Sequence, residues 1–248
     1  MSATISITEA QIFTALGAVL QSFGPVNAAG TLIPIVRGQV NRVPAPAAAD
    51  YAVMWPILRE RLEFNVTTYS DNIVTGSIAG NVLSVTAVAN GAVAPGQTLY
   101  GPNVTGSPVV VSQATGTPGG VGTYALNGSQ TAASGPVYCG TKAMMQPQQM
   151  TVQVDIHGPA SADNASRIAT QWFDETGVQA CLDQGAIIAP LYANPPRQIP
   201  FVNDQDQWEE RWVVELVLQA SPIVTVTQQF ADALVLGLIE IDATYPPT

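Results

Sequence analysis

The sequence lacks charge along much of its middle. No Asp, Glu, Lys or Arg occurs between Asn72 and Thr141, and every carboxylate side chain lies in the two flanking segments. The uncharged stretch is rich in Gly, Val, Thr and Ser, and apolar residues such as Leu83 and Val85 alternate with polar ones before Gly-containing breaks, which is typical of strands and turns. We therefore predict a small all-β module at residues 72–145, inserted into a loop of a host domain that comprises residues 1–71 and 146–248.

Basic residues and long apolar runs are also scarce. Eight Lys and Arg stand against 18 Asp and Glu, which gives a net charge of −10. Such a chain repels a phosphate backbone, so direct nucleic-acid binding is disfavoured, although an acidic wall past which DNA slides is not. The N-terminal stretch contains Glu9 and no basic residue before Arg37, so we do not expect it to act as a signal peptide. Because no apolar run is long enough to span a bilayer, we expect a soluble protein.

Residues that carry catalysis or bind metals are few. Cys139 and Cys181 fit neither a metal spacing nor a disulfide framework and are expected to be unpaired, buried thiols. His157 is the single histidine, and we expect it on the surface beside a turn rather than in a triad. Glu209 and Glu210 point to opposite faces of a strand and cannot flank one bond. The acidic residues at 204–210 lack the Gly and terminal Glu of an EF-hand loop, so no catalytic residue, cofactor or metal site is predicted.

The host reads as an α+β domain. Capping boxes at Ser6–Glu9 and Thr8–Gln11 predict a helix that ends at Gly24-Pro25, and a second helix is predicted from Ser161, with Trp172 and Phe173 packing it onto a sheet beside Trp212. Alternation predicts strands at 32–37, 61–69, 150–156 and 208–219, a short helix near 230–234 and a closing strand at 235–241. The fold class is therefore a mostly antiparallel sheet flanked by two helices.

Inside the module we expect only strands. Glycines at 91, 96, 101 and 106 recur every five residues, but the period is not sustained, so a compact sandwich or barrel of short strands is favoured over a solenoid. The run Gly119-Gly120-Val121-Gly122 is interpreted as a turn, because no Lys and no helical pattern follow it.

Several segments of the host resemble the phage neck or tail terminator family. They are DIHGPASADNASRIATQWFD (155–174), the stretch from PLYANPPRQIPFVNDQDQWEERW to GLIEID (190–242) and, more weakly, VRGQVNRVPAP near Arg37. The module resembles a different unit that recurs in phage tail and virion proteins, through LSVTAV, GQTLYGPNV and TGTPGGVGTYALNGSQT. Members of the terminator family usually connect the strands near Tyr69 and Met150 by a much shorter segment.

The resemblance implies a structural role without catalysis. Terminators form a ring of six copies that caps the tail tube and joins it to the head connector, so the implied partners are further copies of the chain, the tail tube protein and the head–tail connector protein. DNA passes through the ring without specific binding, and the protein resides in the virion after assembly in the host cytoplasm. The competing hypothesis is a virion-anchored binding protein whose inserted module recognises host surface glycans.

Ring closure needs a heterologous contact, which extended arms and sheet edges supply. The Pro-rich segments and the half-polar face of the strand that contains Trp208 are therefore the candidate interfaces for oligomerisation or partner binding. Their residues are Asn41, Arg42, Pro44, Pro195, Pro196, Arg197, Glu209, Arg211 and Glu215.

Overall fold

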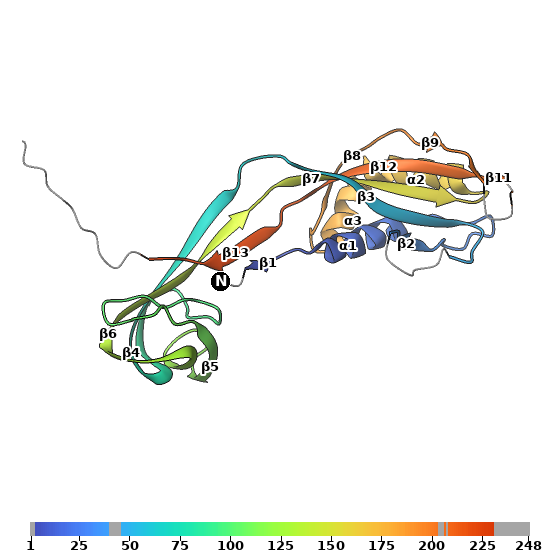
Figure 1. Cartoon of the computed structure of the whole chain (residues 1–248). Helices are drawn as coiled ribbons and strands as arrows, with labels where there is room; N and C mark the ends of the chain where they lie inside the picture. Colours follow the sequence, from blue (N-terminus) through green and yellow to red (C-terminus); the bar gives the residue numbers. More distant parts are fainter. Residues whose placement is uncertain (1–2, 40–45, 203–205, 207, 231–248) are drawn as a thin grey trace, which may run out of the picture. The chain divides into compact units, whose positions relative to one another are not determined.

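A computed structural model describes residues 3–39, 46–202, 206 and 208–230 (Figure 1). The described chain divides into two compact units: a larger one of residues 4–67 and 144–225, and a smaller one of residues 68–143 with residues 3 and 226–230. Each unit has its own core of buried apolar side chains. The chain is a mixed α+β protein dominated by strands, as the sequence predicts. That the smaller unit is an insertion with boundaries at 72 and 145 stays a prediction.

The larger unit is built on a six-stranded sheet. Its strands follow the order β2-β3-β7-β12-β8, and β9 also pairs with β12. All pairings are antiparallel except that of β2 with β3, so the predicted mostly antiparallel sheet is confirmed. The strand bounds are β2 Ile35–Arg37, β3 Tyr51–Arg61, β7 Gln148–His157, β8 Ala189–Ala193, β9 Arg197–Gln198 and β12 Arg211–Ala220.

Three helices occur in the described part of the chain, whereas two were predicted to flank the sheet in addition to the short one near 230–234: they are α1 Glu9–Ser22, α2 Ser161–Trp172 and α3 Glu175–Asp183. The capping box that forms at α1 is the one at Thr8: its backbone N–H donates to Gln11 Oε1 over 2.8 Å, and Gln11 N–H donates to Thr8 Oγ1 over 3.3 Å. Helix α1 ends before Gly24, whose φ of +67° favours glycine. The third helix, α3, carries Cys181.

The helices pack against one face of the sheet. Alternate residues of β7 point to that face, and the strand register places Met54, Val154 and Val214 side by side on it. These side chains share one buried core with residues of all three helices. Trp172 is 1% exposed, meets Phe23 edge-on at 6.4 Å between ring centroids, and donates its indole N–H to Val217 O over 3.3 Å.

Phe173, predicted to pack beside Trp172, is instead 64% exposed. It is the C-terminal cap of α2, where the chain leaves the helix. Helical spacing identified the buried stripe but did not show that the stripe ends at Trp172.

The strand predicted at 61–69 is displaced in the structure. Strand β3 runs from Tyr51 to Arg61 and pairs with β7 as far as Arg61 and Gln148, whereas residues 62–65 lie between strands. Pro56 lies inside β3, where the register with β7 shifts between Pro56 and Leu58. Proline cannot donate to a ladder and argues against a strand unless it lies at an edge or a bulge, which is why this strand is hard to find by pattern.

The predicted strand at 208–219 is divided into two. Its first part, β11 Trp208–Glu209, pairs with β10 Phe201–Val202 in a separate two-stranded ribbon. Trp208 is 78% exposed, whereas Trp212 on β12 packs partly buried against the core. The helix predicted near 230–234 lies outside the described residues apart from Phe230, and the strand predicted at 235–241 lies wholly outside them.

The smaller unit is all-β in its described residues. Its main strands are β4 Val66–Asn90, β5 Val110–Gly116 and β6 Gly122–Met145, and β6 pairs with both β4 and β5. Two short strands, β1 Thr4–Ile5 and β13 Ile223–Thr227, pair with each other; β1 belongs to the larger unit, and β13 has residues in both units. Strands of 25 and 24 residues replace the short ones expected. Between β5 and β6, the backbone N–H of Gly120 donates a hydrogen bond to Thr117 O over 2.8 Å, so the glycine run there forms a turn.

Candidate partner-binding surface

Two pairs of charged or titratable side chains lie on the sheet face opposite the main core. Arg211 forms an ion pair with Asp155, whose side chain is 1% exposed, and Gln153 Nε2 donates to the other oxygen of that carboxylate over 2.5 Å. His157 Nδ1 lies 3.0 Å from Glu209 Oε1, and the Tyr51 ring stacks on His157 with 4.5 Å between centroids. Burial raises the pKa of the Tyr51 hydroxyl, and the charge of Glu209 raises it further, so Tyr51 stays protonated at neutral pH.

The expectation of a surface position for His157 is wrong. The residue is 7% exposed, because β12 pairs it with Arg211 on one side and β3 pairs it with Tyr51 on the other. His157 is the last residue of β7, a strand with neighbours on both sides, and the Gly158-Pro159 turn that follows it suggested an exposed position.

A second charged group lies where β12 meets the Pro-rich segment. Arg197 Nη2 donates to Glu215 Oε1 over 2.5 Å, and Asn194 Nδ2 donates to Glu215 Oε2 over 2.8 Å. The side chain of Arg197 is 58% exposed, whereas that of Glu215 is 20% exposed. Pro195 and Pro196 therefore lie between Asn194 and Arg197, two residues that both hydrogen-bond to Glu215 in the middle of the sheet.

The predicted interface residues fall into separate groups in the structure. Glu215 and Arg197 lie together, while Glu209 and Arg211 belong to the cluster around His157 and Asp155. Asn41, Arg42 and Pro44 lie outside the described residues. The role of all nine residues in a partner interface stays a prediction.

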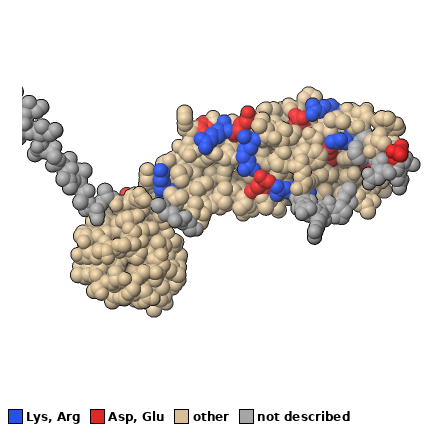
Figure 2. All heavy atoms as spheres, in the orientation of Figure 1, with Lys and Arg blue, Asp and Glu red and all other residues tan. Residues whose placement is uncertain are grey.

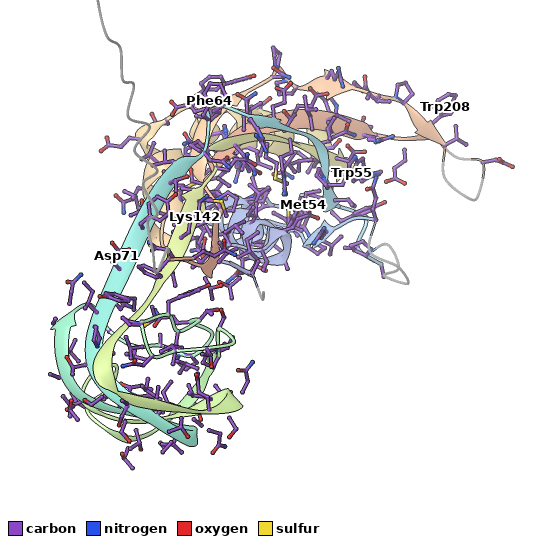
Figure 3. All side chains as sticks on the ribbon, turned by 60° about the vertical axis from the view of Figure 1, so that its left-hand side comes forward. Met54, Trp55, Phe64, Asp71, Lys142 and Trp208 are labelled. Atoms are coloured by element: carbon purple, nitrogen blue, oxygen red, sulfur yellow. The ribbon has the colours of Figure 1, made fainter. Side chains whose placement is uncertain are left out.

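An exposed apolar segment joins β3 to β4, and the sequence pattern did not reveal it as exposed. Phe64 is 93% exposed and Leu62 is 43% exposed, and the segment 61–66 borders an open hollow of about 730 Å³. Figure 3 labels Phe64 and Trp208, the two most exposed large apolar side chains in the described part of the chain. The alternation of Leu62, Phe64 and Val66 places the three side chains on one face of the strand predicted at 61–69, but alternation does not show whether that face is covered.

The described residues offer little reactive chemistry. Burial raises the pKa of both Cys139 and Cys181 to about 11, so their thiols are protonated and poorly nucleophilic, and they form no disulfide. Among residues 3–39, 46–202, 206 and 208–230, no three His, Cys, Asp or Glu side chains gather in a way that would hold a metal ion. No helix in the described part of the chain is long and apolar enough to cross a membrane.

The protein is therefore an α+β protein in which several charged side chains form ion pairs and the two thiols are unreactive. A family described as phage neck terminator protein matches residues 102–242, which is more than half of the chain. The chain therefore belongs to the phage neck terminator protein family, a structural and non-enzymatic family of the neck and tail junction. No curated protein matches the chain at a significant level.

The match begins at Pro102, within the segment predicted to be inserted, and continues through the larger unit to Asp242. It covers both host segments on which the resemblance chiefly rests, at 155–174 and 190–242.

Proposed function

We propose that the protein is a ring-forming tail terminator that caps the tail tube and joins it to the head connector. Membership of the neck terminator family carries this proposal. The ring contains six copies, its other partners are the tail tube protein and the head–tail connector protein, and its place is the neck of the virion. The module at 72–145 is a sandwich-like insert of the terminator domain.

The edges of the larger sheet support ring formation. Strand β2 pairs with β3 only through Ala52, Val53 and Met54, so among the described strands nothing pairs with that side of β3 from Trp55 to Arg61. At the opposite side, β8 pairs with β12 alone. Two unlike edges on one subunit suit a heterologous contact, which closes into a ring when the rotation between copies allows it.

Termination requires one face that binds the tube and another that offers no equivalent surface to a further tube subunit. Arg197 with Pro195 and Pro196, together with Glu209, Arg211 and Glu215, are the proposed contributors to partner contacts. Charge complementarity at the rim of an interface fixes partner and register more than it adds affinity.

The test follows tail length by electron microscopy in a phage that lacks this protein. We expect tails of irregular length that fail to join heads. Tails of normal, uniform length that still join heads would overturn the proposal, as would purified protein that shows no ring alone or with tail tubes.

The residue-level test is Arg197→Glu, because Arg197 is exposed and holds its partner at the surface. Arg211→Glu is a poorer choice, since it would place a second carboxylate against the buried Asp155 and damage the fold. Gln179→Glu on α3 adds negative charge at another exposed position, with loss of the hydrogen bond from Gln179 to Asp183, and serves as the control. We expect the first variant to impair head joining or tail length and the control to behave as the wild type.

A further inference from the structure

The smaller unit contains a polar hollow that the terminator role leaves unused. It has a volume of about 380 Å³ and lies between the turn at residues 105–108 and residues 127–130 of β6. Side chains with hydroxyl or amide groups line it, together with glycine and Pro108. Its size is at the lower end of the range for small-ligand sites.

Two amide side chains of the hollow are held in fixed orientation by their oxygens. Asn127 Oδ1 accepts the backbone N–H of Val109 over 2.8 Å, and Gln130 Oε1 accepts the backbone N–H and the hydroxyl of Thr105 over 2.8 and 3.0 Å. Within the described residues neither amide nitrogen has a hydrogen-bond partner. The hollow therefore presents NH₂ donors whose positions are set before any ligand arrives, which lowers the entropic cost of binding.

The turn supplies hydroxyl groups and a small apolar surface. Gly106 and Ser107 have φ values of +67° and +47°, and serine is uncommon in this left-handed region, so the backbone of the turn has a defined conformation at Ser107. Pro108 is buried beneath it, and Gly128 lies next to Pro108 with no side chain to fill the space. The Pro108 ring offers an apolar contact, and the amide and hydroxyl groups around it can form hydrogen bonds. Such a lining is complementary to a molecule in which C–H and O–H groups alternate closely.

Electrostatics narrow the ligand class. No charged residue occurs between Asn72 and Thr141, and Figure 2 shows the face of this unit free of charged side chains except at its margin. A charged ligand would lose hydration without gaining an opposite charge. The lining has no aromatic ring on which a nucleobase would stack. We propose that the hollow at 105–108 and 127–130 binds a neutral saccharide.

The test measures retention of the full-length protein on an array of neutral hexose and N-acetylhexosamine oligosaccharides, with sialylated and uronic-acid oligosaccharides beside them. Asn127→Asp and Gln130→Glu each keep the internal acceptor oxygen but replace the NH₂ donor with an anionic oxygen. We expect the wild type to bind neutral members of the array, and each variant to bind them at least tenfold more weakly.

Asn81→Asp is the matched control, because it makes the same chemical change at an exposed position of β4 outside the hollow. Thermal unfolding of every variant separates loss of binding from loss of fold, and Asn127→Asp and Gln130→Glu act on separate internal bonds. The proposal is overturned if the wild type retains no neutral oligosaccharide, if it prefers the anionic ones, or if both folded variants bind as the wild type does. None of these outcomes bears on the terminator role, which the tail-length experiment tests separately.

Discussion

Asp155 is the most buried charged side chain in the described part of the chain, and its pairing shapes the larger unit at the residue scale. An exposed ion pair contributes about 0–1 kcal/mol, whereas removal of one partner from a buried pair leaves an uncompensated charge and costs about 3–5 kcal/mol. The two ion pairs that involve a residue of β12, Arg211–Asp155 and Arg197–Glu215, differ in this respect. Arg211 pairs with a carboxylate that water does not reach, and Arg197 pairs near the surface.

Replacement of Arg211 should therefore be far more damaging than replacement of Arg197. We expect Arg211→Met to lower the free energy of unfolding by about 3–5 kcal/mol, because Asp155 remains buried without its cation. Arg197→Met should cost less than about 1 kcal/mol. Urea denaturation followed by tryptophan fluorescence measures both, and equal losses would contradict the difference in burial.

Trp172 and Phe173 are adjacent in sequence and opposite in environment. We expect Trp172→Ala to lower the free energy of unfolding by about 3–5 kcal/mol, since it opens a cavity between α2 and the sheet and removes a hydrogen bond to Val217 O. Phe173→Ala should change stability by no more than about 0.5 kcal/mol, as at other exposed positions.

Chemical denaturation with circular dichroism avoids the loss of the tryptophan signal. A cost below about 1 kcal/mol at Trp172 would refute its place in the core. A large cost at Phe173 would show that a neighbouring copy covers it.

At the scale of elements, the two cores share no residue. One draws on residues between Ile12 and Ala220 that lie outside 68–143, and the other draws on residues between Val74 and Cys139. Strands β4, β6 and β13 contribute residues to both units, so continuous strands rather than loops connect them.

Separate cores predict separate folding. Replacement of Thr75 to Thr141 with a short Gly-Ser linker should leave the larger unit with a single cooperative unfolding transition. Calorimetry and circular dichroism measure it, and the wild type should show an additional transition or a larger enthalpy. A truncated chain that unfolds without cooperativity would show that the larger unit depends on the smaller.

At the scale of the whole molecule, charge is unevenly distributed along the chain. All 18 carboxylates and eight basic residues lie outside 72–141. Two of the arginines that could contribute to a basic face are paired: Glu9 contacts both Arg37 and Arg59, the latter over 3.3 Å. Around Glu9, therefore, the arginines do not form a cluster of unpaired positive charges that would attract DNA to this protein of net charge −10.

We expect the purified protein to leave duplex DNA unretarded in a gel-shift experiment at low salt, where weak electrostatic binding is strongest. Such behaviour suits a ring through which a genome passes without being held. Tight, salt-sensitive retardation would contradict the prediction and would point to Arg37, Arg42, Arg59 and Arg61 as a basic surface.

The sequence by itself determined the features that depend on neighbouring residues. The capping box at Thr8, the alternation of β7, the start of α2 and the turn at Gly119–Gly122 all follow from local spacing and backbone preference, and structure and sequence agree on them. The resemblance at 155–174 and 190–242 likewise rested on motifs in order, and the family match confirms it.

Only the tertiary structure decided which residues are covered. His157 became buried because Tyr51 and Arg211 are its partners on two neighbouring strands, and β3, with Pro56 inside it, formed because β7 offered an edge. Phe64 and Phe173 stayed exposed although one lies in an alternating pattern and the other next to the apolar stripe of a helix. Burial depends on segments far away in the sequence, and a local pattern contains no information about where those segments lie.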